Sequence, residues 1–139
     1  YDKLENKIRC DRILNTAMQY PGNYGYIPNT KAMDNDALDI LMICDYPIYP
    51  GTIVNCRVVA VLLMEDEKGL DEKVLVVPSE KVDPNYIHYQ DLEDLPKILT
   101  SKIKHFFLHY KDMETDKWVK VQGFKNKEYA IQLYQKYKI

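Results

Sequence analysis

The sequence lacks the features that mark several large classes of protein. Its 139 residues include three cysteines and no C-x-x-C pair, so neither a disulfide framework nor a zinc knuckle is indicated. No apolar run approaches the length of a membrane span, and no signal peptide, internal repeat or low-complexity segment is visible. A formal net charge of -2 excludes a general attraction for nucleic acid or for an anionic membrane. We expect one domain over residues 1–139, cytoplasmic and with reduced thiols.

Phenylalanine and tryptophan are also scarce, whereas tyrosine is abundant. Twelve tyrosines stand against three phenylalanines and one tryptophan, so most aromatic rings carry a hydroxyl that can donate to an anion. Tyr20, Tyr24 and Tyr26 lie in a stretch rich in proline and glycine, residues 20–28. We predict a rigid, irregular loop that presents these rings, although Tyr20 and Tyr26 could equally cover one end of a β-barrel.

An acidic stretch precedes the most apolar part of the chain: residues 34–39 read Asp-Asn-Asp-Ala-Leu-Asp. In an extended chain Asp34 and Asp36 share a face and Asp39 has the opposite parity, so a bend at the small Ala37 would bring the carboxylates together. They repel one another unless a cation compensates, and oxygen-only ligands suit Mg²⁺, above all with a phosphorylated substrate. The alternative is a solvated acidic turn before a strand. An EF-hand is excluded, because the required glycine and glutamate are missing.

The apolar pattern predicts a mainly β chain that ends in two helices. Alternation and β-branched runs indicate strands over residues 8–13, 37–44, 52–64, 73–77 and 117–121. The third of these is long enough to be bent or interrupted by a bulge. Helical spacing indicates one helix over 94–112, capped by Asp94, and a second helix capped by Asn126. Short strands joined by turns favour a compact barrel or sandwich over a parallel α/β sheet.

A charged hairpin loop separates the third and fourth predicted strands. Asp66 and Asp71 lie on its two arms, and Lys73 shares a face with Asp71 because it is two residues further on. If this hairpin lies beside residues 34–39, five carboxylates meet, which an ordinary fold tolerates only with bound cations. Taken alone, the loop is a solvated charged turn.

The long predicted helix ends with a hydroxyl and an ammonium side by side, Tyr110 and Lys111, which together could bind phosphate. Lys111 could equally be a cation that stabilises the negative, C-terminal end of the helix dipole. His105 and His109 are four residues apart, a spacing that zinc ligands use, but the glutamate of HExxH is missing between them. We interpret both as surface or half-buried histidines.

Taken in order, these motifs resemble the soluble family I inorganic pyrophosphatases of the short bacterial type. The core signature of that family is D-x-D-P-x-D followed by a hydrophobic residue, and residues 34–40 match it except that Ala37 replaces proline. The other matches keep their order and spacing along nearly the whole chain: Arg12 within Asp-Arg, and the segments 20–26, 64–73, 105–112 and 117–121.

The resemblance implies an α+β fold that is mainly β, a five-stranded OB-like barrel with two C-terminal helices packed on it. It implies hydrolysis of pyrophosphate to two orthophosphates, with several Mg²⁺ ions that Mn²⁺ or Zn²⁺ could replace, in a cytoplasmic homohexamer. Asp36 would be the general base that deprotonates the attacking water. The metal ligands would be Asp34, Asp39, Asp66 and Asp71. The substrate would be bound by Arg12, Tyr24, Lys73, Tyr110 and Lys111, with Tyr20 in support.

Two departures from the family pattern affect this expectation. Ala37 removes the fixed φ of proline, which would loosen the metal loop slightly. The family also carries a phosphate-binding lysine and a metal-linked glutamate just upstream of the position matched by Tyr1, so we expect the natural protein to have them and this chain to be a trimmed version.

Two other interpretations stay open. One is a folded fragment that lacks full catalytic power. The other is a barrel that binds an oligonucleotide or another anion, with its tyrosines as stacking platforms and without hydrolysis. The carboxylate cluster argues against nucleic-acid binding, because it would repel a phosphate backbone unless metal were bound.

Overall fold

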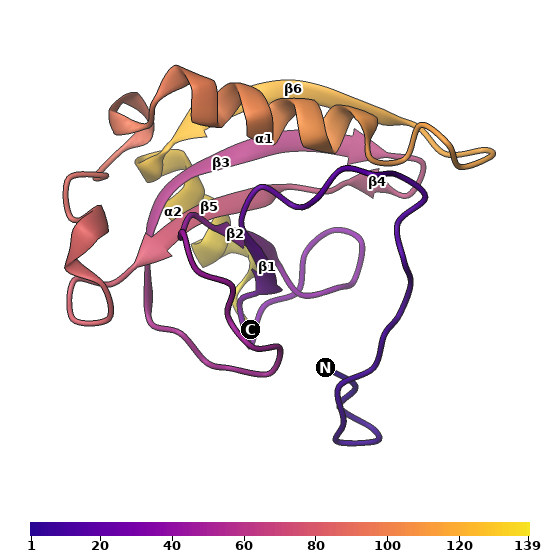
Figure 1. Cartoon of the computed structure of the whole chain (residues 1–139), viewed down its shortest axis with the longest axis horizontal. Coiled ribbons are helices and arrows are strands. Elements are labelled where there is room, and N and C mark those ends of the chain that lie inside the picture. Colours follow the sequence, from indigo (N-terminus) through magenta and orange to yellow (C-terminus); the bar gives the residue numbers. More distant parts are fainter.

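One mixed β-sheet between two helices forms the centre of the molecule (Figure 1). The computed structural model describes residues 1–139. The strands are β1 (Asn23–Tyr26), β2 (Asp39–Met42), β3 (Cys56–Asp66), β4 (Gly69–Leu70), β5 (Lys73–Pro78) and β6 (Val119–Asn126). The helices are α1 (Lys97–His109) and α2 (Lys127–Tyr137), with the short 3-10 turns η1 (Pro84–Tyr86) and η2 (Leu92–Asp94) ahead of α1.

The sheet is open and almost entirely antiparallel. Its strand order is β1-β2-β5-β3-β4, and β6 pairs with the other side of β3. Only β2 and β5 run parallel. Because β1 pairs with β2 alone, the sheet does not close on itself. The predicted mainly β architecture with two helices is confirmed, whereas the predicted barrel is not. Neither helix is both long and apolar enough to cross a membrane.

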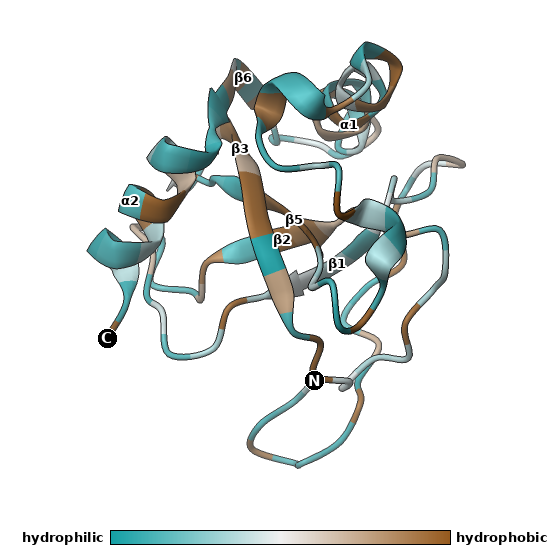
Figure 2. Cartoon of the chain, turned by 90° about the vertical axis from the view of Figure 1, so that its left-hand side faces the viewer, coloured by the Kyte–Doolittle hydropathy of each residue, from teal (hydrophilic) through white to brown (hydrophobic).

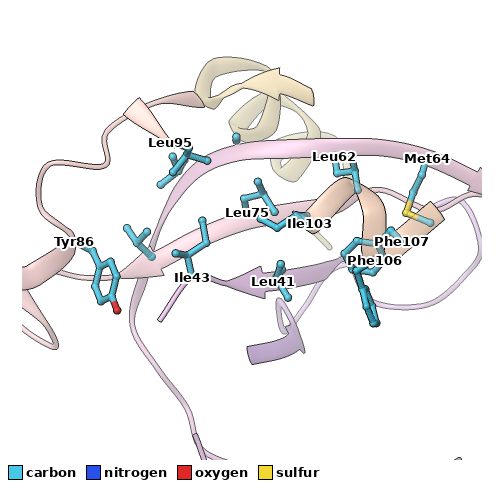
Figure 3. Close-up of a cluster of buried hydrophobic side chains, with 13 residues drawn as sticks. Leu41, Ile43, Leu62, Met64, Leu75, Tyr86, Leu95, Ile103, Phe106 and Phe107 are labelled. Carbon is cyan, nitrogen blue, oxygen red and sulfur yellow. The ribbon is translucent and has the colours of Figure 1, made fainter. Parts of the chain in front are cut away.

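Each face of the sheet packs against one helix, because side chains alternate along a strand. On the buried strand β5, Leu75 and Val77 belong to a cluster of 13 buried residues that includes the apolar stripe of α1 (Figure 3). Val74 and Val76 point the other way, into a cluster of 8 buried residues that includes the apolar stripe of α2. Figure 2 shows α1 and α2 on opposite sides of the hydrophobic β3.

The predicted interruption of the long strand is confirmed in β3. Its register with β5 shifts between Val58 and Ala60, and its register with β6 shifts between Leu63 and Met64. Such bulges increase the local twist of a strand, so β3 curves along the sheet (Figure 1). The strand begins at Cys56, four residues later than predicted.

Two predictions near the start of the chain are wrong. Residues 8–13 form no strand, and Ile8 and Ile13 are 55% and 85% exposed, so their alternation has no apolar surface to pack on. Residues 20–28, predicted to be irregular, contain β1. Strand pairing is possible there because Gly22 has no side chain where the backbone comes closest to β2.

The start of α1 also differs from the prediction. Asp94 does not cap this helix but closes the capping box of η2, and α1 begins after Pro96 without a side-chain cap. The cause is Pro96, which disfavours helical geometry in the preceding residue, and Leu95 is accordingly extended with φ -76° and ψ 131°. The predicted cap of α2 is confirmed, since the Asn126 side chain accepts a backbone N–H from the first helical turn at 3.0 Å.

Replacing Gly22 tests the close approach of β1 to β2. A Cβ atom at this position would lie 2.6 Å from the carbonyl oxygen of Met42, so Gly22→Ala forces a backbone shift that we expect to cost about 1–3 kcal/mol of unfolding free energy in urea titration. Gly25→Ala is the matched control, because its Cβ would meet only the Ile40 side chain at 3.6 Å. Equal stability of the two variants would contradict the packing described for β1.

Candidate active site

The polar cluster lies where β2 and β5 begin. The parallel pairing of these strands places Asp39 opposite Lys73, each at the first position of its strand. Because side chains alternate along a strand, Asp39 and Lys73 point to the same face of the sheet as the buried cluster that packs against α1. The 3% exposed Lys73 side chain also lies near the ring of Phe107 from α1, 5.8 Å from its centroid. The parallel register therefore brings an acid and a buried base together.

The ammonium of Lys73 is the hub of the cluster. It donates to Asp39 Oδ2 and to Asp71 Oδ1, each at 2.7 Å, and to the hydroxyl oxygen of Tyr24 at 2.9 Å. The Tyr24 hydroxyl in turn donates to Asp39 Oδ2 at 2.7 Å. All three ammonium donors are thus used, and the predicted shared face of Asp71 and Lys73 is confirmed.

The electrostatics of this hub are set by burial and by the two carboxylates. Burial alone would lower the pKa of Lys73, but Asp39 and Asp71 outweigh it and raise the pKa well above the ordinary value. For the carboxyl of Asp71 burial has the opposite effect and raises the pKa, and the nearby ammonium of Lys73 offsets this rise only in part. Desolvation also raises the pKa of the Tyr24 hydroxyl, which stays protonated and remains a donor. The resulting cluster is one cation between two anions, with one more negative charge than positive.

A second ion pair joins the hairpin to the end of α1. Lys111 Nζ donates to Asp66 Oδ2 at 2.8 Å, and Glu67 Oε1 lies 3.9 Å from the same nitrogen. Asp66 is 6% exposed. Burial would raise the pKa of Asp66, but the hydrogen bonds from Lys111 and from the backbone N–H of Lys68 hold the pKa below the ordinary value. The approach of Glu67 was not predicted, although its place beside Asp66 in the hairpin was a signal for it.

Aromatic rings line the side of the cluster that faces α1. The ring centroid of Tyr20 lies 4.9 Å from that of Tyr24 and 4.6 Å from that of Phe106. Tyr110 stacks on Phe106 at 5.3 Å. Burial raises the pKa of both Tyr20 and Tyr110. Tyr20 adjoins the hub through Tyr24, and Tyr110 adjoins it through Phe107, whose ring centroid lies 5.7 Å away. Phe106 gave no sequence signal of this role, because it lies within the apolar stripe of α1.

Three of the predicted site residues lie outside these contacts. Arg12 is exposed and its Nε pairs with Asp11 at 2.9 Å, outside the cluster. Asp34 and Asp36 lie in the loop before β2, where the Asp34 side chain accepts the backbone N–H of Asp36 at 3.0 Å. The carboxylate of Asp36 makes no hydrogen bond or ion pair in the structure.

The donor set fits a hard cation such as Mg²⁺. The carboxylates of Asp39 and Asp71 converge on one positive charge, the ammonium of Lys73, and no thiol or imidazole is among the neighbours. No set of three or more His, Cys, Asp or Glu side chains is arranged around a common metal position. The predicted histidine pair lies elsewhere: His109 is exposed and its Nδ1 is 2.8 Å from Asp112 Oδ2.

Replacing Lys111 tests the second ion pair. In Lys111→Met, Asp66 stays buried but loses its ion-pair partner, so we expect the Asp66 pKa to rise. The measurement is the carboxyl ¹³C shift of Asp66 against pH in metal-free protein. Lys117→Met is the control, because that lysine pairs with Glu114 at 3.4 Å instead. An Asp66 pKa that stays low in Lys111→Met would contradict the assignment.

Comparison with known proteins agrees with the motifs. Residues 1–138 match the family model described as inorganic pyrophosphatase. The chain is 50% identical over 133 residues to an inorganic pyrophosphatase of Rickettsia typhi, covering 96% of this chain and 75% of that protein. It superposes on the Helicobacter pylori inorganic pyrophosphatase with a TM-score of 0.95 at 47% identity, over 98% of this chain and 80% of that one. For the Thermus thermophilus inorganic pyrophosphatase the TM-score is 0.92 at 45% identity, over 97% and 78% of the two chains. The chain therefore belongs to the inorganic pyrophosphatase family of hydrolytic enzymes.

Proposed function

We propose that this chain hydrolyses inorganic pyrophosphate to two orthophosphates, using a water molecule activated by bound Mg²⁺. The observation that carries the proposal is the buried Lys73 ammonium between Asp39 and Asp71, in a member of this family. Phosphoryl transfer asks a protein mainly to position the substrate and to neutralise its charge. A group of carboxylates, ammonium groups and tyrosine hydroxyls on one sheet face is suited to that task.

The carboxylates would hold the metal ions. Asp34, Asp39 and Asp71 would bind the first metal, and Asp66 with Asp71 a further one. When bound, Mg²⁺ neutralises the pyrophosphate and lowers the pKa of a coordinated water so that hydroxide forms near neutral pH. Mn²⁺ or Zn²⁺ would be substitutes. Two observations support this: the possible ligands are all oxygen atoms, and the carboxylates of Asp39 and Asp71 both pair with one positive charge.

The cationic and hydroxyl groups would grip the phosphate oxygens. Lys73 and Lys111 now neutralise carboxylates, so a metal that takes over those carboxylates leaves both ammonium groups free for substrate. Tyr24 and Tyr110 keep their protons at neutral pH because burial raises their pKa, and each can therefore donate. Arg12 would add a guanidinium, the group best shaped for a bidentate grip on a phosphate.

Asp36 would accept the proton of the attacking water. Its carboxylate is exposed and unengaged, whereas those of Asp39, Asp66 and Asp71 are each tied to an ammonium. A general base must be free to reach the water, and the Asp36 carboxylate meets this condition.

The proposed setting is a cytoplasmic homohexamer that acts on free pyrophosphate. Tyr49 and Ile53, in the segment between β2 and β3, are 83% and 91% exposed, an apolar surface suited to association between copies. No contact favours the alternative of an oligonucleotide-binding module, because the Tyr24 hydroxyl is engaged with Asp39 and Lys73 and the cluster carries excess negative charge.

The test compares Asp36→Asn with the unmodified chain in an orthophosphate-release assay with pyrophosphate and Mg²⁺. We expect kcat to fall by about 10²–10⁴-fold, because the amide cannot accept the proton of the water. A chelator should abolish the activity of the unmodified chain. Asp83→Asn is the control, since that residue caps η1 and asparagine can cap as well. Retention of full activity in Asp36→Asn would refute the role of the base. An unmodified chain that stays inactive even when the upstream lysine and glutamate of the family are restored would refute the function.

A further inference from the structure

Glu72 lies between two residues of the proposed site but faces away from them. Because side chains alternate along an extended chain, Asp71 and Lys73 point toward α1 while Glu72 points toward α2. Glu72 is 6% exposed, and its Oε1 accepts a hydrogen bond from the hydroxyl of Tyr137 at 2.9 Å. Its other oxygen, Oε2, is buried with no hydrogen-bond partner. The proposed reaction uses neither Glu72 nor Tyr137.

A buried carboxylate at this position is costly. The neighbouring cluster is apolar, formed by residues such as Val74 and Leu133, and burying a polar carboxyl group there carries a desolvation penalty that one hydrogen bond offsets only in part. A packed apolar side chain would give a more stable core. The polar contact between Glu72 and Tyr137 is therefore not explained by packing alone.

Tyr137 reaches the other acidic segment as well. Its backbone oxygen accepts the N–H of Lys31 at 2.8 Å, three residues before Asp34. Next to this contact Thr30 bridges to Lys138, and one residue further along both segments the N–H of Ile139 donates to the Asn29 oxygen at 2.9 Å. The last residue of α2 and the two residues that follow it thus fix the base of the loop that carries Asp34 and Asp36.

The base of this loop is also closed from within. The hydroxyl of Thr30 accepts the N–H of Leu38 at 2.9 Å and donates to the Ile27 oxygen at 2.6 Å. The charge of Asp34 is one of the influences that raise the pKa of the Tyr137 hydroxyl, after burial and the contact with Glu72. The hydroxyl of Tyr137 therefore lies within the electrostatic reach of both acidic segments.

We propose that Tyr137 is a positioning residue that fixes the two carboxylate-bearing segments, 34–39 and 66–73, relative to each other through Glu72 and Lys31. Its hydroxyl holds the chain between Asp71 and Lys73, and its backbone oxygen holds the chain ahead of Asp34. This inference rests on the proposed function, because it assigns Tyr137 to the assembly of the metal-binding carboxylates.

The experiment measures Mn²⁺ affinity without pyrophosphate, by electron paramagnetic resonance, in Tyr137→Phe and in Tyr134→Phe. Tyr134 is a half-buried tyrosine on the same helix whose hydroxyl makes no hydrogen bond, so its variant is the matched control. We expect the Mn²⁺ dissociation constant to be at least threefold larger in Tyr137→Phe and unchanged in Tyr134→Phe. Both are measured well below the melting temperature of each variant, so that a loss of stability alone would not move the constant.

Unchanged Mn²⁺ affinity in Tyr137→Phe would overturn the positioning role while leaving the proposed function intact. An unmodified chain that binds no Mn²⁺ would instead refute the proposed function itself. If Tyr137→Phe does not fold, hydrogen exchange of the unmodified chain decides. Mg²⁺ should slow exchange of the Lys31 amide, which donates to Tyr137, and protection confined to residues 34–39 and 66–73 would overturn the inference.

Discussion

The buried ammonium of Lys73 is the interaction on which the site depends. Asp39 and Asp71 come from different parts of the chain, and their carboxylates converge only because a cation lies 2.7 Å from each. Without it, two partly buried anions would face each other, and such pairs either take up a proton or separate. The ammonium places a positive charge where a bound metal ion would also place one.

The fold supplies this arrangement through one unusual pairing. β2 and β5 are the only parallel neighbours in the sheet, and their register sets Asp39 beside Lys73 at the same end. The two helices then stabilise opposite faces of these strands. α1 contributes the aromatic rings under the cluster, whereas α2 contributes Tyr137 behind it. The position of each charged group consequently depends on packing on both sides of the sheet.

Local features of this site could be predicted from the sequence, and long-range ones could not. Alternation placed Asp71 and Lys73 on one face, which the structure confirms, and the acidic residues 34–39 were predicted to bind a cation ahead of a strand. The parallel register of β2 and β5 joins residues 34 positions apart, and no local pattern reports such a pairing. The contact of Glu72 with Tyr137 spans 65 positions and was missed for the same reason. The roles of Arg12 and Asp36 rested on resemblance to the family and stay predictions.

The errors have local physical causes. Residues 8–13 alternate as a strand does but have no partner strand, and apolar alternation alone does not form a strand. The glycines of residues 20–28 indicated irregular structure, although here they permit the close pairing of β1 with β2. Pro96 shifted the start of α1, which the apolar spacing alone placed too early.

The most direct test of the central claim is X-ray diffraction from crystals of this chain grown with Mn²⁺, collected at the manganese absorption edge. The account predicts an anomalous peak in contact with the carboxylates of Asp39 and Asp71, where the Lys73 ammonium now supplies the positive charge. A manganese peak elsewhere, with Asp39 and Asp71 still paired to Lys73, would contradict it.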